Sequence, residues 1–157
     1  MENVEVPASK RVDKVGRDVV RTPMQWDDSP NAGFSSPEVE PWLPVAADYA
    51  QRNLAVEAAD PDSILSLYRR MLALRRGSPA LREGSFARVP VHGNALAYLR
   101  EARGDRAFAA VNFGYERVEV AVPAGTVAVA TSRAREGDRV EGSCTLEGNE
   151  ALVVTLD

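Results

Sequence analysis

The spacing of hydrophobic positions divides the chain into three stretches, and the first has no regular period. Residues 1–60 carry most of the ten prolines, together with Trp26, Phe34, Trp42 and Tyr49. Long loops without periodicity are uncommon in compact domains, and disordered segments are poor in aromatic residues. We therefore interpret residues 1–60 as an ordered loop that packs against another part of a protein.

The second stretch predicts a helix over residues 61–76. Asp60 is a suitable N-cap, and Pro61 suits the first helical position, where its missing N–H costs nothing. Gly77 followed by Pro79 predicts the end of the helix. The apolar positions with helical spacing are Ile64, Leu65, Tyr68, Met71 and Leu72. This apolar face is broad, so we expect the helix to need a surface to cover it.

The third stretch, from residue 80 onward, alternates short apolar runs with turn residues such as Gly93 and Gly104. The predicted strands are Phe86–Val91, Ala95–Arg100, Arg106–Phe113, Arg117–Val122, Thr126–Ser132 and Ala151–Leu156. Short strands at such close intervals are typical of an antiparallel sandwich or barrel.

Composition narrows the classes of partner and location. The net charge is −4, which gives no attraction to nucleic acid or to an anionic membrane surface. No apolar run approaches the ~20 residues that span a bilayer, and the first residues lack the features of a signal peptide. Cys144 is the single cysteine, so no intramolecular disulfide can form. We expect a cytoplasmic location.

The most informative segment is residues 16–27, which read GRDVVRTPMQWD. It is followed by NAGF at 31–34, PWLPV at 41–45 and ADPDSIL at 59–65. This succession resembles glycoside hydrolase family 13 of the α-amylase superfamily, in the branch that holds α-glucosidases, oligo-1,6-glucosidases, dextran glucosidases and trehalose synthases. The resemblance runs from about residue 1 to 85 and continues to 157 mainly through position and β texture.

The resemblance implies a fold class for each part of the chain. Residues 1–78 would be the end of a (β/α)8 TIM barrel, with residues 1–60 as its last long loop and 61–76 as its eighth helix. Residues 79–157 would form an all-β antiparallel C-terminal sandwich. The remainder of the catalytic barrel is then expected upstream, as the partner on which the loop and helix pack.

The implied function is that of a retaining α-glucosidase that acts on terminal α-linked glucose of oligosaccharides. Such enzymes need two carboxyl groups ~5–5.5 Å apart, which the family carries on earlier barrel strands. No segment here resembles those strand ends, so we assign no catalytic residue and expect the chain alone to be inactive. We expect no organic cofactor and no metal site.

One substrate-binding residue carries over from the resemblance. Arg21 matches an arginine that resembling enzymes use in the pocket for the terminal glucose. A guanidinium offers several fixed donors to sugar hydroxyls, which suits that role. A structural salt bridge is the alternative interpretation of Arg21.

Two other functional interpretations remain open from the sequence. The chain could belong to a trehalose synthase, which isomerises maltose and shares the RTPMQW segment. It could instead be a non-catalytic carbohydrate-binding or structural β module. Residues 86–157 contain no tryptophan, which disfavours a sugar-binding platform.

Structural roles are preferred for the remaining chemistry-bearing residues of the loop. We interpret Arg17 and Asp18 as a pair that braces the loop. The rings of Trp26, Phe34 and Trp42 could reach a sugar, but we favour packing within the loop.

The same holds for four residues that resemble possible catalytic groups. Asp27 and Asp28 are adjacent, so their side chains diverge, and a turn or cap is the better interpretation. His92 precedes a Gly-Asn turn and is read as a hairpin residue, without the partners that a zinc site needs. Cys144 is read as a small buried side chain.

Overall fold

The computed structural model describes residues 21–157, so the predictions for Arg17 and Asp18 lie outside the described residues. The chain divides into two compact units. The first ends at Leu65, and the second is Ser66–Asp157. Each unit is described by itself below. Within residues 21–157, no helix combines the length and the apolar character that crossing a membrane requires.

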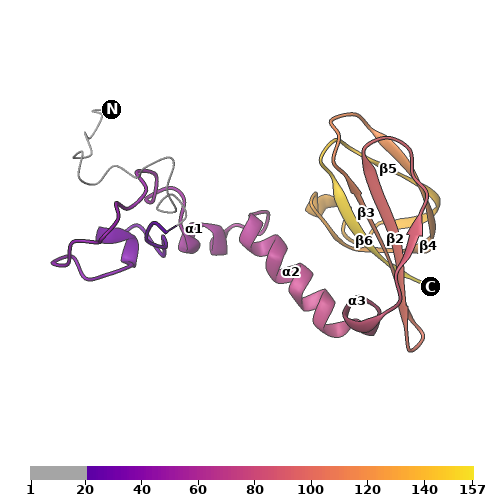
Figure 1. Cartoon of the computed structure of the whole chain (residues 1–157), viewed down its shortest axis with the longest axis horizontal. Coiled ribbons are helices and arrows are strands. Elements are labelled where there is room, and N and C mark those ends of the chain that lie inside the picture. The colour runs from indigo at the N-terminus through magenta and orange to yellow at the C-terminus, as the bar shows by residue number, and fades with distance from the viewer. Residues whose placement is uncertain (1–20) are drawn as a thin grey trace. The chain divides into compact units, whose positions relative to one another are not determined.

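The described part of the first unit contains a helix that the sequence does not predict. Helix α1 spans Leu54–Ala59 within the stretch interpreted as loop (Figure 1). Asn53 starts it, since its Oδ1 accepts from the Val56 amide at 2.9 Å, while its Nδ2 donates to the Tyr49 carbonyl at 2.8 Å. Six residues are too few to show a helical period, which explains the missed prediction.

A tight turn, η3, spans Pro30–Gly33 and has an unusual backbone. Asn31, Ala32 and Gly33 have φ values of 56°, 56° and 66°, all in the left-handed region. The side chain of Asn31 stabilises this turn, because its Nδ2 donates to the carbonyls of Ser36 at 3.0 Å and Val39 at 2.8 Å. The side chain of one asparagine thus holds a backbone that would otherwise be strained.

Helix α2 spans Ile64–Gly77 and confirms the predicted helix. It begins three residues after Pro61, the predicted first position. The predicted N-cap, Asp60, instead accepts from the Asp62 amide at 2.9 Å in a turn. Glu57 satisfies the start of α2, because its Oε2 accepts from the Leu65 amide at 3.1 Å. The carboxylate on the preceding helix therefore moves the start of α2 toward the C-terminus.

A further short helix, α3, spans Pro79–Glu83 where the sequence predicts only the end of α2. Ser78 is its N-cap and accepts from the Leu81 amide at 3.1 Å. Asp105 accepts from the Ala80 amide at 2.9 Å and also from the Ser78 hydroxyl. Through Asp105, α3 is joined to the sheet that follows it.

The β region forms one six-stranded sheet in which every neighbouring pair is antiparallel (Figure 1), so the predicted antiparallel all-β region is confirmed. The strand order is β1-β2-β3-β6-β4-β5. The strands are β1 (Ala87–Val89), β2 (Ala95–Ala102), β3 (Asp105–Asn112), β4 (Val118–Ala130), β5 (Arg139–Leu146) and β6 (Ala151–Leu156), and a short turn η4 (Arg133–Arg135) precedes β5.

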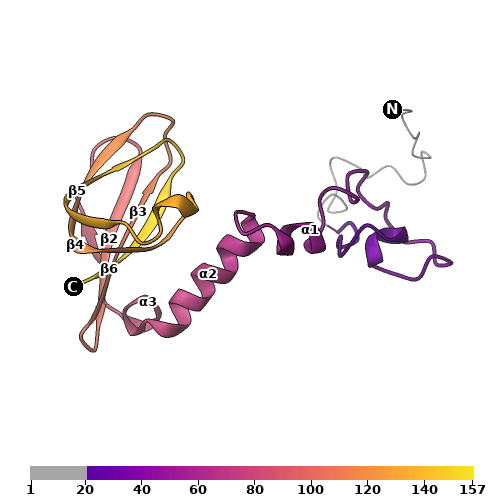
Figure 2. The ribbon, with the colours of Figure 1, turned by 180° about the vertical axis from the view of Figure 1, so that it is seen from behind.

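Two strand predictions are wrong in detail. The predicted strands Arg117–Val122 and Thr126–Ser132 belong to one long strand, β4 (Figure 2). Pro123 lies inside it, where the register with β5 shifts between Val122 and Gly125. Proline lacks an amide donor, so an irregularity in the pairing accommodates it. Strand β5 was not predicted, because its buried positions, Val140, Cys144 and Leu146, are separated by polar residues and glycine.

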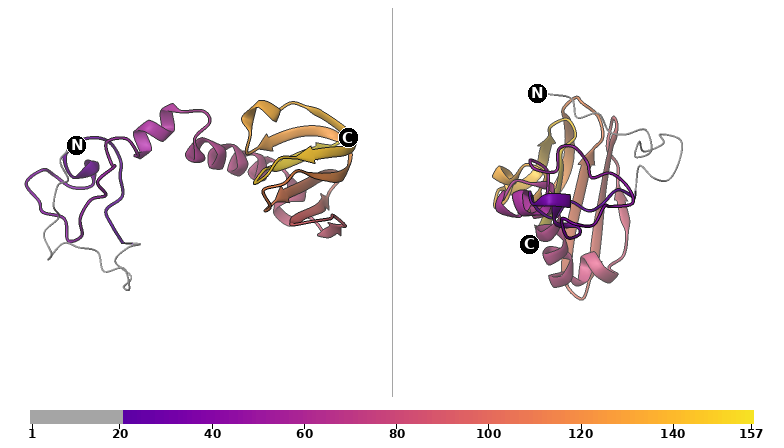
Figure 3. Two further views of the ribbon diagram at one scale, coloured as in Figure 1. Left: turned by 90° about the horizontal axis from the view of Figure 1, so that it is seen from above. Right: turned by 90° about the vertical axis from the view of Figure 1, so that its left-hand side faces the viewer.

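The hydrophobic core lies within the sheet of the second unit and draws on strands from its whole width. Figure 3 shows this twisted sheet from two further directions. The fully buried large side chains are Phe108, Val120, Val127, Leu146, Leu152 and Val154, with Asn112 among them. Strands β3 and β6 lie side by side in register, from Ala107 opposite Thr155 to Val111 opposite Ala151. This centre of the sheet is the best-packed part of the described chain.

Candidate functional site

Arg21, the predicted substrate-binding residue, is solvent-exposed and lines a cavity of about 230 Å³. The other lining residues are Pro23, Phe34, Trp42 and Leu43. The cavity therefore combines one cation with aromatic and aliphatic surface. Binding sites for small molecules commonly have this mixture, in which a few polar groups orient a ligand against apolar walls.

The left-handed turn η3 determines where Phe34 lies in this cavity. Phe34 follows Gly33 directly, and its amide donates to the Asn31 carbonyl at 3.0 Å. The Ala32 carbonyl accepts from the Trp26 amide at 2.9 Å, which joins the turn to the RTPMQW segment. The motif residues 21–27 and the NAGF segment thus form one hydrogen-bonded structure.

Asp27 stabilises the same turn, as the sequence predicted for the Asp27–Asp28 pair. Its Oδ1 accepts from the Ser29 amide at 2.9 Å and from the Ser29 hydroxyl. Both bonds favour the ionised carboxylate and lower the pKa of Asp27 from its ordinary value, the bond from the Ser29 hydroxyl more than the bond from the Ser29 amide. A Cβ at Gly33 would lie 2.7 Å from Asp27 Oδ1, so glycine fits this position for space as well as for φ. Asp27 therefore acts as a structural group.

The aromatic rings of this unit are more exposed than predicted. Trp26 is 45% exposed, Phe34 50% and Trp42 93%. The interpretation of these three rings as packing residues of the loop is wrong for residues 21–157, since all three are exposed there. The rings of Phe34 and Trp42 are instead available at the cavity that Arg21 lines.

A larger cavity of about 330 Å³ in the first unit has a different character. Its polar lining includes Asn53 and Glu57, which already serve as caps of α1 and α2. Gln25 and Arg52 also line it, and both contact Asp48, so each polar side chain of this cavity has a partner within the chain. The Arg21 cavity is the better candidate site.

The Arg21 cavity can bind hydroxyl groups but offers no acid or base for catalysis, because no carboxylate is among the residues that line it.

Among residues 21–157, no group of three or more His, Cys, Asp or Glu side chains could hold a metal ion. His92 is exposed in the connection between β1 and β2, as predicted.

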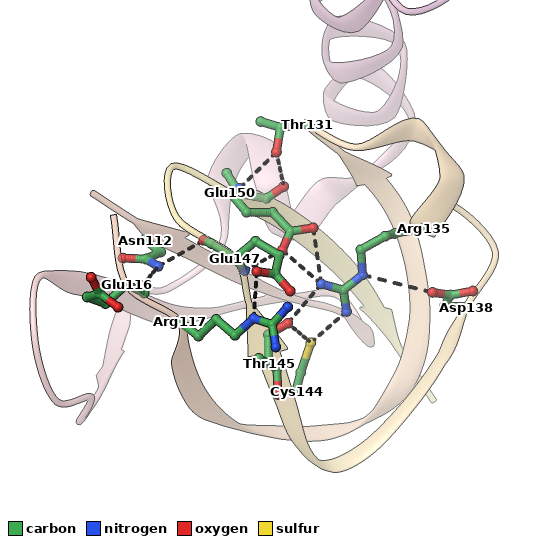
Figure 4. A network of polar contacts seen from close by, with 11 residues as sticks. Asn112, Glu116, Arg117, Thr131, Arg135, Asp138, Cys144, Thr145, Glu147 and Glu150 are labelled. Atoms are coloured by element: carbon green, nitrogen blue, oxygen red, sulfur yellow. Dashed lines mark hydrogen bonds and ion pairs between the residues drawn. The ribbon is translucent and has the colours of Figure 1, made fainter. Parts of the chain in front are cut away.

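The second unit contains a polar network that sequence reasoning missed (Figure 4). Arg135 Nη1 lies 3.0 Å from Glu150 Oε2, and Arg135 Nη2 donates to Cys144 Sγ at 3.1 Å. Cys144 is 5% exposed, which confirms its prediction as a buried side chain. Burial by itself lowers the pKa of Arg135, but the bonds to Cys144 and Glu150 outweigh it and raise that pKa.

Glu150 also accepts from the Glu147 amide at 2.8 Å, so its carboxylate is used on both sides. No spacing in the sequence marks this network, because its members come from η4, β5 and the turn before β6. Its hydrogen bonds join those three elements, which gives it a structural role.

Comparison with known proteins identifies the family. The family described as "Alpha amylase, catalytic domain" matches residues 2–84. A probable α-glucosidase of Rhizobium meliloti is 40% identical over 108 residues, covering 69% of this chain and 19% of that protein. An oligo-1,6-glucosidase of Heyndrickxia coagulans is 36% identical over 113 residues, covering 71% of this chain and 20% of that protein.

Among solved structures, the trehalulose synthase MutB from Pseudomonas mesoacidophila is similar with a TM-score of 0.77 and 32% identity. The similarity covers 90% of this chain and 26% of that chain. The chain thus spans about a fifth of the length of the two curated relatives. The family match ends just after α3, and the antiparallel sheet follows it, as expected for the end of a catalytic barrel and a C-terminal β region. From these matches, the chain belongs to the α-amylase family, glycoside hydrolase family 13.

Proposed function

We propose that this chain is the C-terminal part of a retaining α-glucosidase that removes terminal α-linked glucose from oligosaccharides. The observation that carries the proposal is the cavity in which Arg21 lies with the rings of Phe34 and Trp42. An arginine donates to several hydroxyls at once, while an aromatic ring offers an apolar face to the C–H groups of a sugar.

The openness of this cavity agrees with a site that is completed by other residues. Its 230 Å³ is below the ~300–1,000 Å³ of common ligand sites. Trp42 is almost fully exposed, so one wall has no cover. The catalytic carboxylates and the missing wall would come from the upstream barrel, and the 157-residue chain alone would have no hydrolytic activity.

Two assays test this function. The first is hydrolysis of p-nitrophenyl α-glucoside by the purified 157-residue chain, for which we expect no release above the blank. The second uses a chimera, the probable α-glucosidase of Rhizobium meliloti in which this chain replaces the matching segment. We expect the chimera to hydrolyse the same substrate, and clear turnover by the isolated chain would refute the fragment interpretation.

The role of Arg21 is tested in the same chimera. Arg21→Ala removes the charged donors that would bind the sugar hydroxyls. Because hydrogen bonds from a charged donor are stronger than neutral ones, we expect kcat/KM to fall at least ~100-fold. The matched control is Arg52→Ala, because Arg52 is exposed and its ion pair among the described residues is with Asp48 at 3.4 Å. Equal, small effects of the two changes would leave Arg21 with a structural role.

A second candidate function is isomerisation, which the similarity to trehalulose synthase favours. The chimera's products separate the two functions, since a hydrolase releases glucose and an isomerase returns a rearranged disaccharide. Maltose and sucrose are the substrates to compare. A non-catalytic β module would instead bind maltooligosaccharides through the isolated chain, with no dependence on Arg21.

A further inference from the structure

Two neighbouring residues of turn η3 that are not glycine, Asn31 and Ala32, both have a left-handed backbone. This conformation places Cβ close to the following carbonyl oxygen, so it costs energy at residues other than glycine. Asparagine tolerates it better than most residues, whereas alanine does not. Such strain persists where the surrounding structure enforces it, and it is concentrated at functional sites. The turn therefore calls for a structural cause and for a functional reason.

The Asn31 side chain provides the structural cause. Its Nδ2 donates to the Ser36 carbonyl at 3.0 Å and to the Val39 carbonyl at 2.8 Å, so it binds the chain that follows the turn. On the other side, the Ala32 carbonyl accepts from the Trp26 amide at 2.9 Å, and Ala32 is fully buried. Hydrogen bonds thus hold the strained turn from both sides.

Phe34 lies between these hydrogen bonds. Its amide donates to the Asn31 carbonyl at 3.0 Å. The hydroxyl of the next residue, Ser35, accepts from Asn31 Nδ2 at 3.2 Å. The Phe34 ring is half exposed and lines the cavity with Arg21 and Trp42, so packing restrains it only in part. Its position therefore depends on the backbone that Asn31 holds.

We propose that Asn31 is a positioning residue of the Arg21 cavity and that it acts through Phe34. By holding the turn, Asn31 keeps the Phe34 ring in the cavity wall, where the ring and the Arg21 guanidinium contact the same sugar. Because the ring is in place before the sugar binds, binding does not have to order the loop. This inference rests on the proposed function, since it takes the α-glucoside of that function as the ligand.

Kinetics of the Rhizobium meliloti chimera test this inference. Asn31→Gly removes the side-chain donor but suits the left-handed backbone, so the turn can still form. Release of the ring weakens binding, and we expect KM for p-nitrophenyl α-glucoside to rise ~10-fold with little change in kcat. The matched control is Asn149→Gly in the second unit, because Asn149 also has a left-handed backbone, with φ of 60°. We expect the control to leave KM unchanged.

A merely structural role of Asn31 gives a different result. A smaller folded fraction would lower the apparent kcat and leave KM unchanged, and this outcome would overturn the proposal. Circular dichroism of each variant measures the folded fraction. If Asn31→Gly prevents folding, Asn31→Ser replaces it, because the serine hydroxyl can still donate one hydrogen bond.

A double-mutant cycle tests whether Asn31 acts through Phe34. Changes that act through one group are not additive, so Asn31→Gly should raise KM less than ~2-fold when Phe34→Ala is already present. A further rise of ~10-fold in that background would mean that Asn31 acts independently of the ring, and would overturn the proposal.

Equilibrium binding separates this inference from the proposed function, because binding does not require hydrolysis. Isothermal titration calorimetry gives the Kd of maltose for the chimera and for its Asn31→Gly variant. A chimera that hydrolyses no glucoside but binds maltose, with ~10-fold weaker binding in the variant, would support the positioning role and contradict the function. Hydrolysis with unchanged KM and Kd in the variant would support the function and overturn the positioning role. Neither hydrolysis nor binding by the chimera would overturn both.

Discussion

Gly125 lies where β4 approaches the backbone of β6 most closely. A Cβ at this position would lie 2.5 Å from the Thr155 carbonyl oxygen and 2.7 Å from Val154 Cγ1. Because the nearest atom belongs to the backbone, the sheet itself would have to move. We expect Gly125→Ala to lower the free energy of unfolding by ~1–3 kcal/mol, measured by urea denaturation with circular dichroism.

Gly77 supplies the matched control for this change. It is the last residue of α2, its φ is not positive, and a Cβ there would meet no atom within 4 Å. Gly77→Ala should be neutral or stabilise by up to ~1 kcal/mol, since alanine loses less backbone entropy on folding. If Gly77→Ala cost as much as Gly125→Ala, steric contact with β6 would not be the reason.

The ion pair between Arg135 and Glu150 gives a second prediction for single residues. The Glu150 side chain is 5% exposed and that of Arg135 24%, so solvent screens this pair less than the exposed pairs. Glu150→Ala would remove the carboxylate that accepts from the Arg135 guanidinium and from the Glu147 amide, and we expect a loss of ~2–3 kcal/mol. Thermal or urea unfolding of the 157-residue chain measures it.

An exposed ion pair provides the comparison. Arg117 Nε lies 2.8 Å from Glu147 Oε2, but the two side chains are 74% and 57% exposed. Arg117→Ala should cost clearly less than Glu150→Ala, because water screens and replaces the pair. Losses of the same size for Glu150→Ala and Arg117→Ala would contradict the view that burial sets the strength of the network in Figure 4.

At the scale of elements, helix α1 depends on one side chain. Asn53 is 5% exposed and joins the Val56 amide to the Tyr49 carbonyl. Asn53→Ala should weaken α1 by ~1 kcal/mol and speed exchange of the Val56 amide several-fold. Hydrogen exchange followed by NMR is the measurement, and Gln51→Ala, at an exposed position, is the control. Unchanged exchange at Val56 would mean that packing, and not the cap, starts the helix.

The elements also show what the sequence could and could not predict. Helix α2 and strands β2, β3 and β6 were found because their apolar positions repeat with a clear period. The start of α2 was missed because Glu57, seven residues before Ile64, caps it through space. Strand β5 was missed because Gly142 interrupts its alternation, which only pairing with β4 restores.

At the candidate site, the motif indicated Arg21, and the structure places this residue in the lining of a cavity with Phe34 and Trp42. Its role in binding substrate stays a prediction. The exposure of Trp42 was not predictable, because a sequence pattern gives the residue type but does not show which other side chains lie close enough to bury it. Arg135 and Glu150 meet only through the fold, so no local pattern announced them.

For the whole molecule, the two compact units differ in how much apolar surface each buries. The core of buried apolar side chains lies in the second unit, where β3, β4 and β6 contribute most of it. In the described part of the first unit, Pro23 and Ala32 are the buried apolar residues, and large rings remain exposed. Hydrogen bonds around η3 and α1 therefore order the first unit more than packing does.

Hydrogen exchange along the whole chain follows from this difference. Amides of β3 and β6 should be protected close to the limit set by global unfolding, because they lie in the centre of the sheet. Amides of residues 21–53 should exchange much faster, since little burial opposes their opening. In the chimera the same residues should gain protection, because the upstream barrel would cover them. Equal protection of both units in the isolated chain would show that residues 21–53 are stable without a partner, and would contradict the proposal that an upstream barrel covers them.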